Sequence, residues 1–342
     1  MLVAEVEKFI LRFKIPARTS RGSLTEKNVY LLKIFDDTNP SVIGIGECST
    51  LSGLSYDDKE EYETFLRIMC RKINMPIPEL KRELVEWPSI RFGLECALIN
   101  LKNGGKEMLF DSQFTRGEWS IPINGLVWMN DTEDMFRQVE EKIAAGFRVI
   151  KLKVGALDFD SELSLIHRIR KAHPAKEIEL RLDANGAFSS ADALHKLKLL
   201  AKYDIHSIEQ PIRQGNSAIM RDLCKRSPIP IALDEELIGH HNSEERYLLL
   251  DMIEPNYIIL KPSLLGGFSA CNDWIRLCGM CNVGYWITSA LESNIGLNAI
   301  AQYTATLKTF EMAQGLGTGT LFENNFPTRL EISGGRLWYN PS

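Results

Sequence analysis

The chain has 342 residues, 44% of them hydrophobic and 25% charged, which is typical of a soluble protein with a substantial buried core. A net charge of −5 argues against nucleic acid or an anionic membrane as the main partner. No apolar run approaches the roughly 20 residues that span a bilayer. The charged amino-terminal stretch is not expected to be a signal peptide. The seven scattered cysteines predict free thiols and a location in the reducing cytoplasm.

Residues 1–115 do not alternate regularly between strands and helices. Three strand-like stretches come first, LVAEVEKFILRF, NVYLLKIFD and VIGIGECS, with turn signals such as DDTNPS between them. Helical patterning follows, over about 56–84 and again in SIRFGLECALINLKN. Strands followed by helices predict an α+β domain.

Residues 116–317 alternate regularly between strand-like runs and amphipathic stretches such as DTEDMFRQVEEKIAAG. The expected strands are 121–126, 148–154, 178–183, 205–209, 229–234, 257–261, 283–289 and, least clearly, 310–314. Eight strands in this length predict an α/β fold of the TIM-barrel type. Residues 318–342 are expected to return to the first domain, and the polar, flexible stretch 17–27 to fold over the mouth of the barrel.

Five charged side chains lie at the ends of successive predicted strands, at intervals of 25 to 30 positions. They are Lys153 in RVIKLKVG, Asp183 in ELRLDANG, Glu209 in HSIEQPI, Asp234 in IALDEE and Lys261 in YIILKPS. This interval is the length of one strand, one helix and two loops. Charged residues at the carboxyl ends of barrel strands are the layout of a TIM-barrel active site, so the chain is predicted to be an enzyme.

Side-chain alternation predicts which way these residues point. Residues two apart in a strand share a face, so Lys151 and Lys153 point one way while Ile150 and Leu152 point the other. We therefore expect both lysines to face the lumen of the barrel rather than an exposed edge.

Asp183, Glu209 and Asp234 come from three successive strands, with no His or Cys among them. Three carboxylates at adjacent strand ends predict a site for a hard cation, Mg²⁺ before Zn²⁺. The alternative is that they are helix caps or separate surface acids, a role open to Asp183 in its DANG turn. Three such residues in phase favour the metal site.

The lysines predict the chemistry. Lys151 and Lys153 precede the three carboxylates and Lys261 follows them, so their ammonium groups approach a bound molecule from opposite faces. A lysine beside a divalent cation has its pKa lowered and can act as a base near neutral pH. The combination suits removal of a proton alpha to the carboxylate of a small molecule, with the metal offsetting the charge of the enediolate.

The motifs KLK, DAN, EQP, LDE and a lone lysine on the sixth strand together resemble the muconate-lactonising subgroup of the enolase superfamily. The resemblance covers nearly the whole chain, because that family has an amino-terminal α+β capping domain before its barrel. The mandelate racemase subgroup is disfavoured, since it has a His-Asp dyad on later strands where this chain has Lys261. Members differ in oligomeric state, so the resemblance predicts none.

Within the subgroup, IRFGLECAL, KPSLLGG and GLGTG most resemble the o-succinylbenzoate synthases. This implies Mg²⁺, with Mn²⁺ as a substitute, on Asp183, Glu209 and Asp234. The implied reaction is the dehydration of 2-succinyl-6-hydroxy-2,4-cyclohexadiene-1-carboxylate to o-succinylbenzoate in menaquinone biosynthesis.

The same resemblance implies roles for individual side chains. Lys153 is the base that removes the alpha proton and assists hydroxide departure, Lys261 is a cation on the other face, and Lys151 supports Lys153 and the metal-bound carboxylate. The remaining expectations are Asn185 at the hydration shell of the metal, and Ser289 and Glu292 in contact with the substrate or with the residues behind it. A helix cap at Ser289 is the alternative for that residue.

Three other functions stay open. A dipeptide or N-acylamino acid epimerase would use the same lysines in turn as acid and base, but dipeptide epimerases usually carry an Asp-x-Asp at strand eight, where this chain has GLGTG. A muconate-type cycloisomerase is the next alternative. An inactive barrel that serves as a binding protein is disfavoured by the intact lysines and carboxylates.

Overall fold

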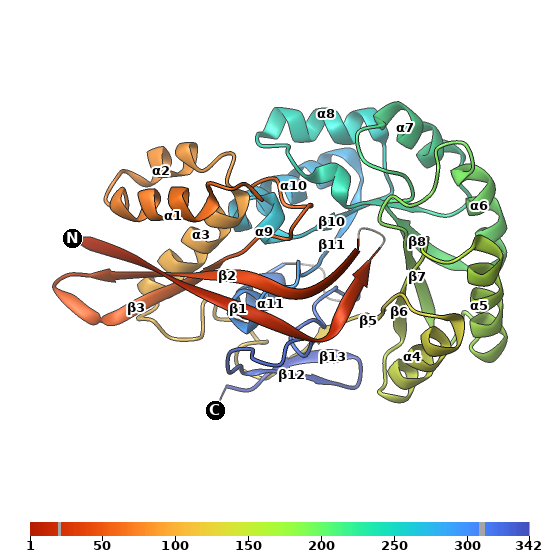
Figure 1. Cartoon of the computed structure of the whole chain (residues 1–342), viewed down its shortest axis with the longest axis horizontal. Helices are drawn as coiled ribbons and strands as arrows, with labels where there is room; N and C mark the ends of the chain where they lie inside the picture. The colour runs from red at the N-terminus through yellow and green to blue at the C-terminus, as the bar shows by residue number, and fades with distance from the viewer. Residues whose placement is uncertain (20–21, 308–311, 342) are drawn as a thin grey trace.

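A computed structural model describes residues 1–19, 22–307 and 312–341 of the chain (Figure 1). Its amino-terminal part is an antiparallel sheet in the order β1 (Leu2–Thr19), β2 (Gly22–Asp36) and β3 (Asn39–Cys48). Both faces of the central strand are covered, since Tyr30 and Leu32 belong to one buried cluster whereas Val29 and Leu31 belong to another. This alternation explains why β2 is apolar along most of its second half.

Helices α1 (Tyr62–Arg71), α2 (Ile77–Glu83) and α3 (Pro88–Lys102) pack on this sheet and complete the predicted α+β domain. The backbones of β3 and α3 touch, because a Cβ atom on Gly46 would lie 1.9 Å from the carbonyl oxygen of Gly93. Glycine at both positions therefore allows the helix to lie directly on the strand.

The stretch 17–27 is mostly strand and not the flexible segment that its composition predicted. Ala17 pairs with Leu24 and Arg18 with Ser23 at the far end of the β1–β2 hairpin. Residues 20 and 21 of this stretch lie outside the described ranges. Side chains such as Ser23 are exposed there, so a polar composition is compatible with strand as well as with a loop.

The second part of the chain is a curved parallel sheet in the order β5-β6-β7-β8-β9-β10-β11. The strands are β5 (Gly125–Val127), β6 (Val149–Lys153), β7 (Glu179–Asp183), β8 (Ile205–Glu209), β9 (Ile231–Leu233), β10 (Tyr257–Leu260) and β11 (Gly284–Ile287). The helices that follow them are α4 (Thr132–Ala144), α5 (Phe159–Ala172), α6 (Ala193–Leu200), α7 (Ser217–Arg226), α8 (Ser243–Ile253), α9 (Pro262–Leu265), α10 (Gly267–Cys281) and α11 (Asn294–Ala305). Figure 1 shows helices α4 to α8 on the outside of the curve, so the predicted α/β class and barrel type are confirmed.

The sheet closes through a short segment that pairs with the chain beside both of its edge strands, β5 and β11. Ile123 forms a parallel bridge with Gln314, and Thr288 forms one with Gly315. Of the predicted eighth strand 310–314, residues 310 and 311 lie outside the described residues, and the observed pairing is at Gln314 and Gly315. The segment 314–315 thus joins the two edges of the curve into a barrel.

The predicted first strand, 121–126, is wrong as a single element. Its beginning is β4 (Ile121–Pro122), which pairs with the carboxyl-terminal hairpin of β12 (Leu330–Ser333) and β13 (Arg336–Tyr339). Only its end, β5, belongs to the barrel sheet. A partner more than 200 residues away in the chain, which the local pattern does not reveal, therefore divides this stretch.

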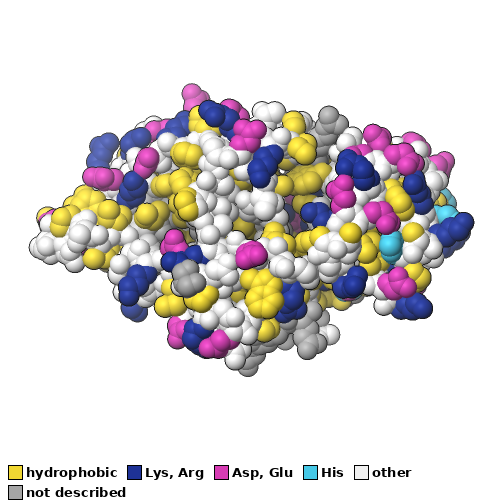
Figure 2. Space-filling view, turned by 90° about the horizontal axis from the view of Figure 1, so that it is seen from below, with side chains coloured by type: hydrophobic (Ala, Val, Ile, Leu, Met, Phe, Trp, Pro, Cys, Tyr) yellow, Lys and Arg dark blue, Asp and Glu magenta, His cyan; other side chains and the backbone are white. Residues whose placement is uncertain are grey.

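The carboxyl-terminal segment also contacts the amino-terminal sheet. Phe13 of β1 forms an antiparallel bridge with Phe322, and their ring centroids are 4.5 Å apart. The borders expected at 115/116 and 317/318 stay predictions. On the face that Figure 2 shows, Lys and Arg side chains are interspersed with Asp and Glu. Across the described ranges, no helix combines the length and apolarity needed to cross a bilayer.

Candidate active site

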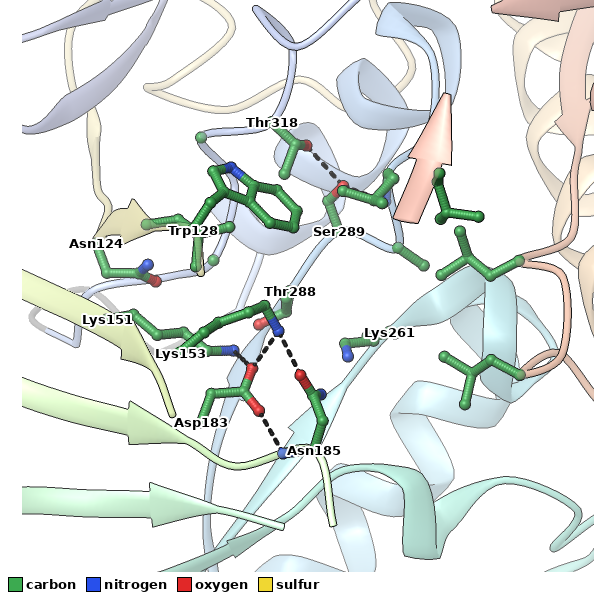
Figure 3. Close-up of a pocket in the computed structure, with 18 of the residues that line it drawn as sticks. Asn124, Trp128, Lys151, Lys153, Asp183, Asn185, Lys261, Thr288, Ser289 and Thr318 are labelled. Carbon is green, nitrogen blue, oxygen red and sulfur yellow. Dashed lines mark hydrogen bonds and ion pairs between the residues drawn. The ribbon is translucent and has the colours of Figure 1, made fainter. Parts of the chain in front are cut away.

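A cavity of about 330 Å³ lies between the end of the β1–β2 hairpin and the carboxyl ends of the barrel strands (Figure 3). The amino-terminal domain contributes a wall of leucine side chains and small residues. The barrel contributes the charged side chains of the floor. The lining residues are Gly22, Ser23, Leu24, Leu51, Ser52, Leu54, Asn124, Leu126, Trp128, Lys151, Lys153, Asp183, Asn185, Lys261, Thr288, Ser289, Ala290, Leu291, Gly315, Gly317 and Thr318.

Alternation along β6 directs its two lysines into this cavity. Lys151 and Lys153 line it, whereas Ile150, Leu152 and Val154 pack in the main core cluster beneath the helices. Both lysines are more than nine-tenths buried, so their charges need partners.

Strand register provides those partners. Lys153 pairs with Asp183 on β7, and Asp183 pairs with Glu209 on β8. Lys151 Nζ lies 2.9 Å from Asp183 Oδ2 and 2.6 Å from Glu209 Oε2, and Lys153 Nζ donates a hydrogen bond to Asp183 Oδ2 at 2.9 Å. Lys261 forms an ion pair with Asp234. The five charged residues predicted from the sequence, together with Lys151, therefore form one cluster.

These contacts shift the pKa values of several members. Burial favours the neutral forms of Lys151 and Lys261, but the carboxylates beside them outweigh it and raise the pKa of both lysines. Burial likewise disfavours the ionised form of Asp183, yet Lys151 and Lys153 hold its pKa well below the usual value. Burial, followed by the charge of Asp183, raises the pKa of Glu209 to about 8. The lowered lysine pKa that we expect beside a bound divalent cation stays a prediction.

The donor set fits a hard divalent cation, although no group of three His, Cys, Asp or Glu side chains among the described residues has metal-holding geometry. Glu209 Oε1 is buried and has no hydrogen-bond partner within the described part of the chain. Two further carboxylates lie on neighbouring strands, so all three side-chain donors are oxygen atoms. Mg²⁺ or Mn²⁺ bound among them would give this buried carboxylate oxygen a partner. The amino groups of Lys151, Lys153 and Lys261 lie within ion-pair distance of these carboxylates.

Asn185 lies beside this cluster with a left-handed backbone, at φ 44°, which asparagine tolerates better than most residues. Its Oδ1 accepts from Lys153 Nζ at 2.7 Å, and its Nδ2 donates to Glu235 Oε1 at 3.0 Å. The amide therefore contacts the predicted base directly. Glu235, which follows Asp234, was not predicted as part of the site.

The residues after β11 divide into a cavity wall and a support behind it. Ser289 lines the cavity, and its hydroxyl lies 2.7 Å from that of Thr318. Glu292 is fully buried and does not line it; its carboxylate accepts from Ser263 Oγ and from the backbone N–H of Ala290. Glu292 therefore lies behind the cavity wall and is not placed to contact the substrate directly. The helix-cap alternative for Ser289 is wrong, because the cap of α11 is Ser293.

Several cavity residues were missed by sequence reasoning. Trp128, after β5, lines the cavity with its ring centroid 6.0 Å from Lys153 Nζ. Thr288 also lines it, is mostly buried, and its Oγ1 has no hydrogen-bond partner among the described residues. Thr288 was detectable, since it alternates with Ile287, which packs in the main core, and so shares a face with Trp286. Asn124 and Trp128 had no comparable signal, because the strand around them is divided.

Comparisons with known proteins agree with this geometry. The family model described as enolase C-terminal domain-like matches residues 134–341. The o-succinylbenzoate synthase of Desulfotalea psychrophila is 45% identical, over 96% of this chain and 96% of that protein. The chain belongs to the enolase superfamily. Enzymes of this superfamily generally use a divalent metal ion, in agreement with the donor set described above.

Solved structures extend the likeness to the whole superfamily fold. The crystal structure of MenC from Desulfotalea psychrophila has a TM-score of 0.88 and 41% identity, covering 98% of this chain and 99% of that one. A dipeptide epimerase from Cytophaga hutchinsonii, solved with Mg and a dipeptide, has a TM-score of 0.85 at 23% identity, covering 99% of this chain and 93% of that one. The second match establishes the fold alone. Superfamily members with different reactions thus share this architecture.

Proposed function

We propose that this enzyme dehydrates 2-succinyl-6-hydroxy-2,4-cyclohexadiene-1-carboxylate to o-succinylbenzoate, a step of menaquinone biosynthesis, in the cytoplasm. The observation that carries the proposal is the 45% identity to an o-succinylbenzoate synthase over nearly the full length of both chains. The cavity supports it, because the ammonium groups of Lys151 and Lys261 in its lining suit an anionic ring carboxylate. Leu24, Leu51 and Leu54, which the amino-terminal domain contributes to the lining, suit an apolar ring.

Asp183, Glu209 and Asp234 are the residues that would hold Mg²⁺, with Mn²⁺ as a substitute. When bound, the ion neutralises the charge that develops on the substrate carboxylate as its alpha proton leaves. Lys151, with raised pKa and ion pairs to Asp183 and Glu209, stays charged and keeps those two carboxylates in place.

Lys153 acts as the base. Its neutral amine takes the alpha proton, the electron pair of the broken C–H bond enters the ring, and the C–O bond to the hydroxyl group breaks. The same ammonium then gives its proton to the departing hydroxide, so that water leaves and the ring becomes aromatic. Asn185 Oδ1 at 2.7 Å holds the amine in position for both transfers.

Lys261 serves as a fixed positive charge on the other side of the cavity. Although burial works against it, Asp234 raises the pKa of Lys261 and keeps the ammonium protonated. A charged, hydrogen-bonded amine cannot accept a proton, but it stabilises a neighbouring anion.

The second candidate is epimerisation of a dipeptide or an N-acylamino acid. It is favoured by one observation, that Lys153 and Lys261 line the same cavity from different strands and so could face a carbon atom from two sides. Gly315, Gly317 and Thr318 line the cavity where dipeptide epimerases usually carry acidic residues, which disfavours a substrate with a free ammonium group.

The proposal is tested by giving the purified protein with Mg²⁺ the cyclohexadiene precursor in one assay, and dipeptides and N-succinylamino acids in another. The first assay is monitored by proton NMR. We expect it to show stoichiometric conversion of the precursor to o-succinylbenzoate. Efficient epimerisation in the second without any dehydration in the first would transfer the assignment to the second candidate.

A further inference from the structure

A buried lysine of the amino-terminal sheet holds one wall of the cavity. Lys27, on β2, is only 6% exposed. Its Nζ donates hydrogen bonds to the carbonyl oxygens of Ala290 and Leu291, at 3.0 and 2.8 Å. Both acceptors belong to the connection between β11 and α11, and both residues line the cavity. The amino-terminal domain thus fixes a turn of the barrel from behind.

This turn has an unfavourable backbone that its contacts maintain. Leu291 has φ 61°, in the left-handed region that leucine rarely adopts. Its N–H donates to Ser289 Oγ at 3.1 Å, and the N–H of Ala290 donates to Glu292 Oε2 at 2.7 Å. Lys27 supplies the donors for the two carbonyl groups of the same turn.

The buried charge of Lys27 is compensated at longer range. Burial lowers the pKa of Lys27, while the carboxylates of Glu292 and Glu47 oppose that shift. Glu47, on β3, accepts from the backbone N–H groups of Ser293 and Gly296 at 3.0 Å each, at the start of α11. The amino-terminal domain therefore supplies both a cation and an anion to this connection.

We propose that Lys27 is a positioning residue that sets the Ser289–Leu291 wall of the cavity and thereby the affinity for substrate. Without its ammonium group, two buried carbonyls lose their donors and Leu291 can relax from the left-handed region. Ser289 Oγ then loses its backbone donor, and the Ser289–Thr318 hydroxyl pair changes its direction. Lys151, Lys153 and Lys261 lie on other strands and keep their places, so the chemical step is retained.

The inference rests on the proposed function only in taking the cavity as the substrate site. Its test compares Lys27→Met with Arg91→Met. Arg91 is a matched control, because this cation of α3 also joins the two parts of the chain, by donating to Ser269 Oγ of α10 at 2.8 Å, and it is not among the described lining residues. Lys27→Gln, which keeps an N–H donor, serves as the conservative variant.

In steady-state assays with the precursor, we expect Lys27→Met to raise KM by about tenfold with kcat nearly unchanged, and Lys27→Gln to fall between it and the wild type. Arg91→Met should lose thermal stability without a change in KM. A wild-type KM in Lys27→Met, or an equal rise in Arg91→Met, would overturn the proposal.

A second measurement needs no substrate. Amide hydrogen exchange over residues 288–296 should accelerate in Lys27→Met and, less, in Lys27→Gln, but stay at the wild-type rate in Arg91→Met. Unchanged exchange in both Lys27 variants would refute the positioning role even if the proposed reaction proved wrong. Failure of the proposed function would appear instead as a wild-type protein that does not convert the precursor.

Discussion

Lys153 Nζ and Asn185 Oδ1 are 2.7 Å apart, and the amide that accepts from this lysine donates on its other side to Glu235. Asn185 was expected at the hydration shell of a metal, but its observed partner is the predicted base itself. The side chain thus fixes where the amine of Lys153 lies, while Asp183 fixes its second hydrogen bond.

Removing this amide should slow the chemical step. Asn185→Gly keeps a residue that tolerates φ 44° but deletes the acceptor, so backbone strain does not complicate the result. We expect kcat to fall by about 10- to 100-fold, the usual cost of losing a supporting hydrogen bond, with a smaller change in KM. An unchanged kcat in Asn185→Gly would show that Lys153 needs no such support.

The carboxylate cluster should bind a divalent cation through Glu209. Glu209→Gln keeps the shape but removes one anionic oxygen, and should lower activity by about 10² to 10³. Calorimetric titration with Mg²⁺ should detect binding to the wild type and much weaker binding to the variant. Glu162→Gln, at another buried carboxylate that accepts backbone N–H groups of 155–157, is the control. Equal Mg²⁺ affinity in all three proteins would contradict the metal assignment.

The barrel and its charged cluster could be predicted because their signals are local. Each charged residue ends its own strand, and β6 alternates lysines with Ile150, Leu152 and Val154, which pack in the core. The divided first strand could not be predicted, since it depends on pairing between Ile121 and Leu337. Contacts between distant segments defined that element, and they also decided the place of Glu292 behind the cavity wall.

Stability should depend on pH through Asp57, a fully buried carboxyl group outside the active site. Burial raises its pKa to about 6, although Ser89 donates two hydrogen bonds to it. Below pH 4 the group is protonated in both the folded and unfolded states. Between pH 4 and 6 only the unfolded state ionises, so the folded state loses stability as pH rises, by about 3 kcal/mol in all.

Asp57→Asn lacks this titration and serves as the reference. Urea denaturation of both proteins should show the wild type losing stability relative to the variant between pH 4 and 7. A constant difference, or a wild type that gains relative stability over this interval, would refute the raised pKa.

The end of the β1–β2 hairpin should respond to ligand. Gly22, Ser23 and Leu24 line the cavity. This segment therefore contacts a molecule bound there and excludes water from its reacting carbon. Limited proteolysis within 17–27 should be slower with o-succinylbenzoate present than in the free protein. Cleavage at another exposed site provides the control, and equal rates within 17–27 in both states would contradict closure over the ligand.

The same substitution at the two opposed lysines tests the account most directly. Lys153→Arg and Lys261→Arg both keep a positive charge but cannot act as a base, because a guanidinium group stays protonated. With the cyclohexadiene precursor in D₂O, we expect Lys153→Arg to lose dehydration by about 10³ or more and to stop exchange of the alpha proton. Lys261→Arg should retain measurable dehydration, since only its charge is used. Dehydration that survives in Lys153→Arg at the wild-type rate would contradict the central claim that Lys153 removes the alpha proton.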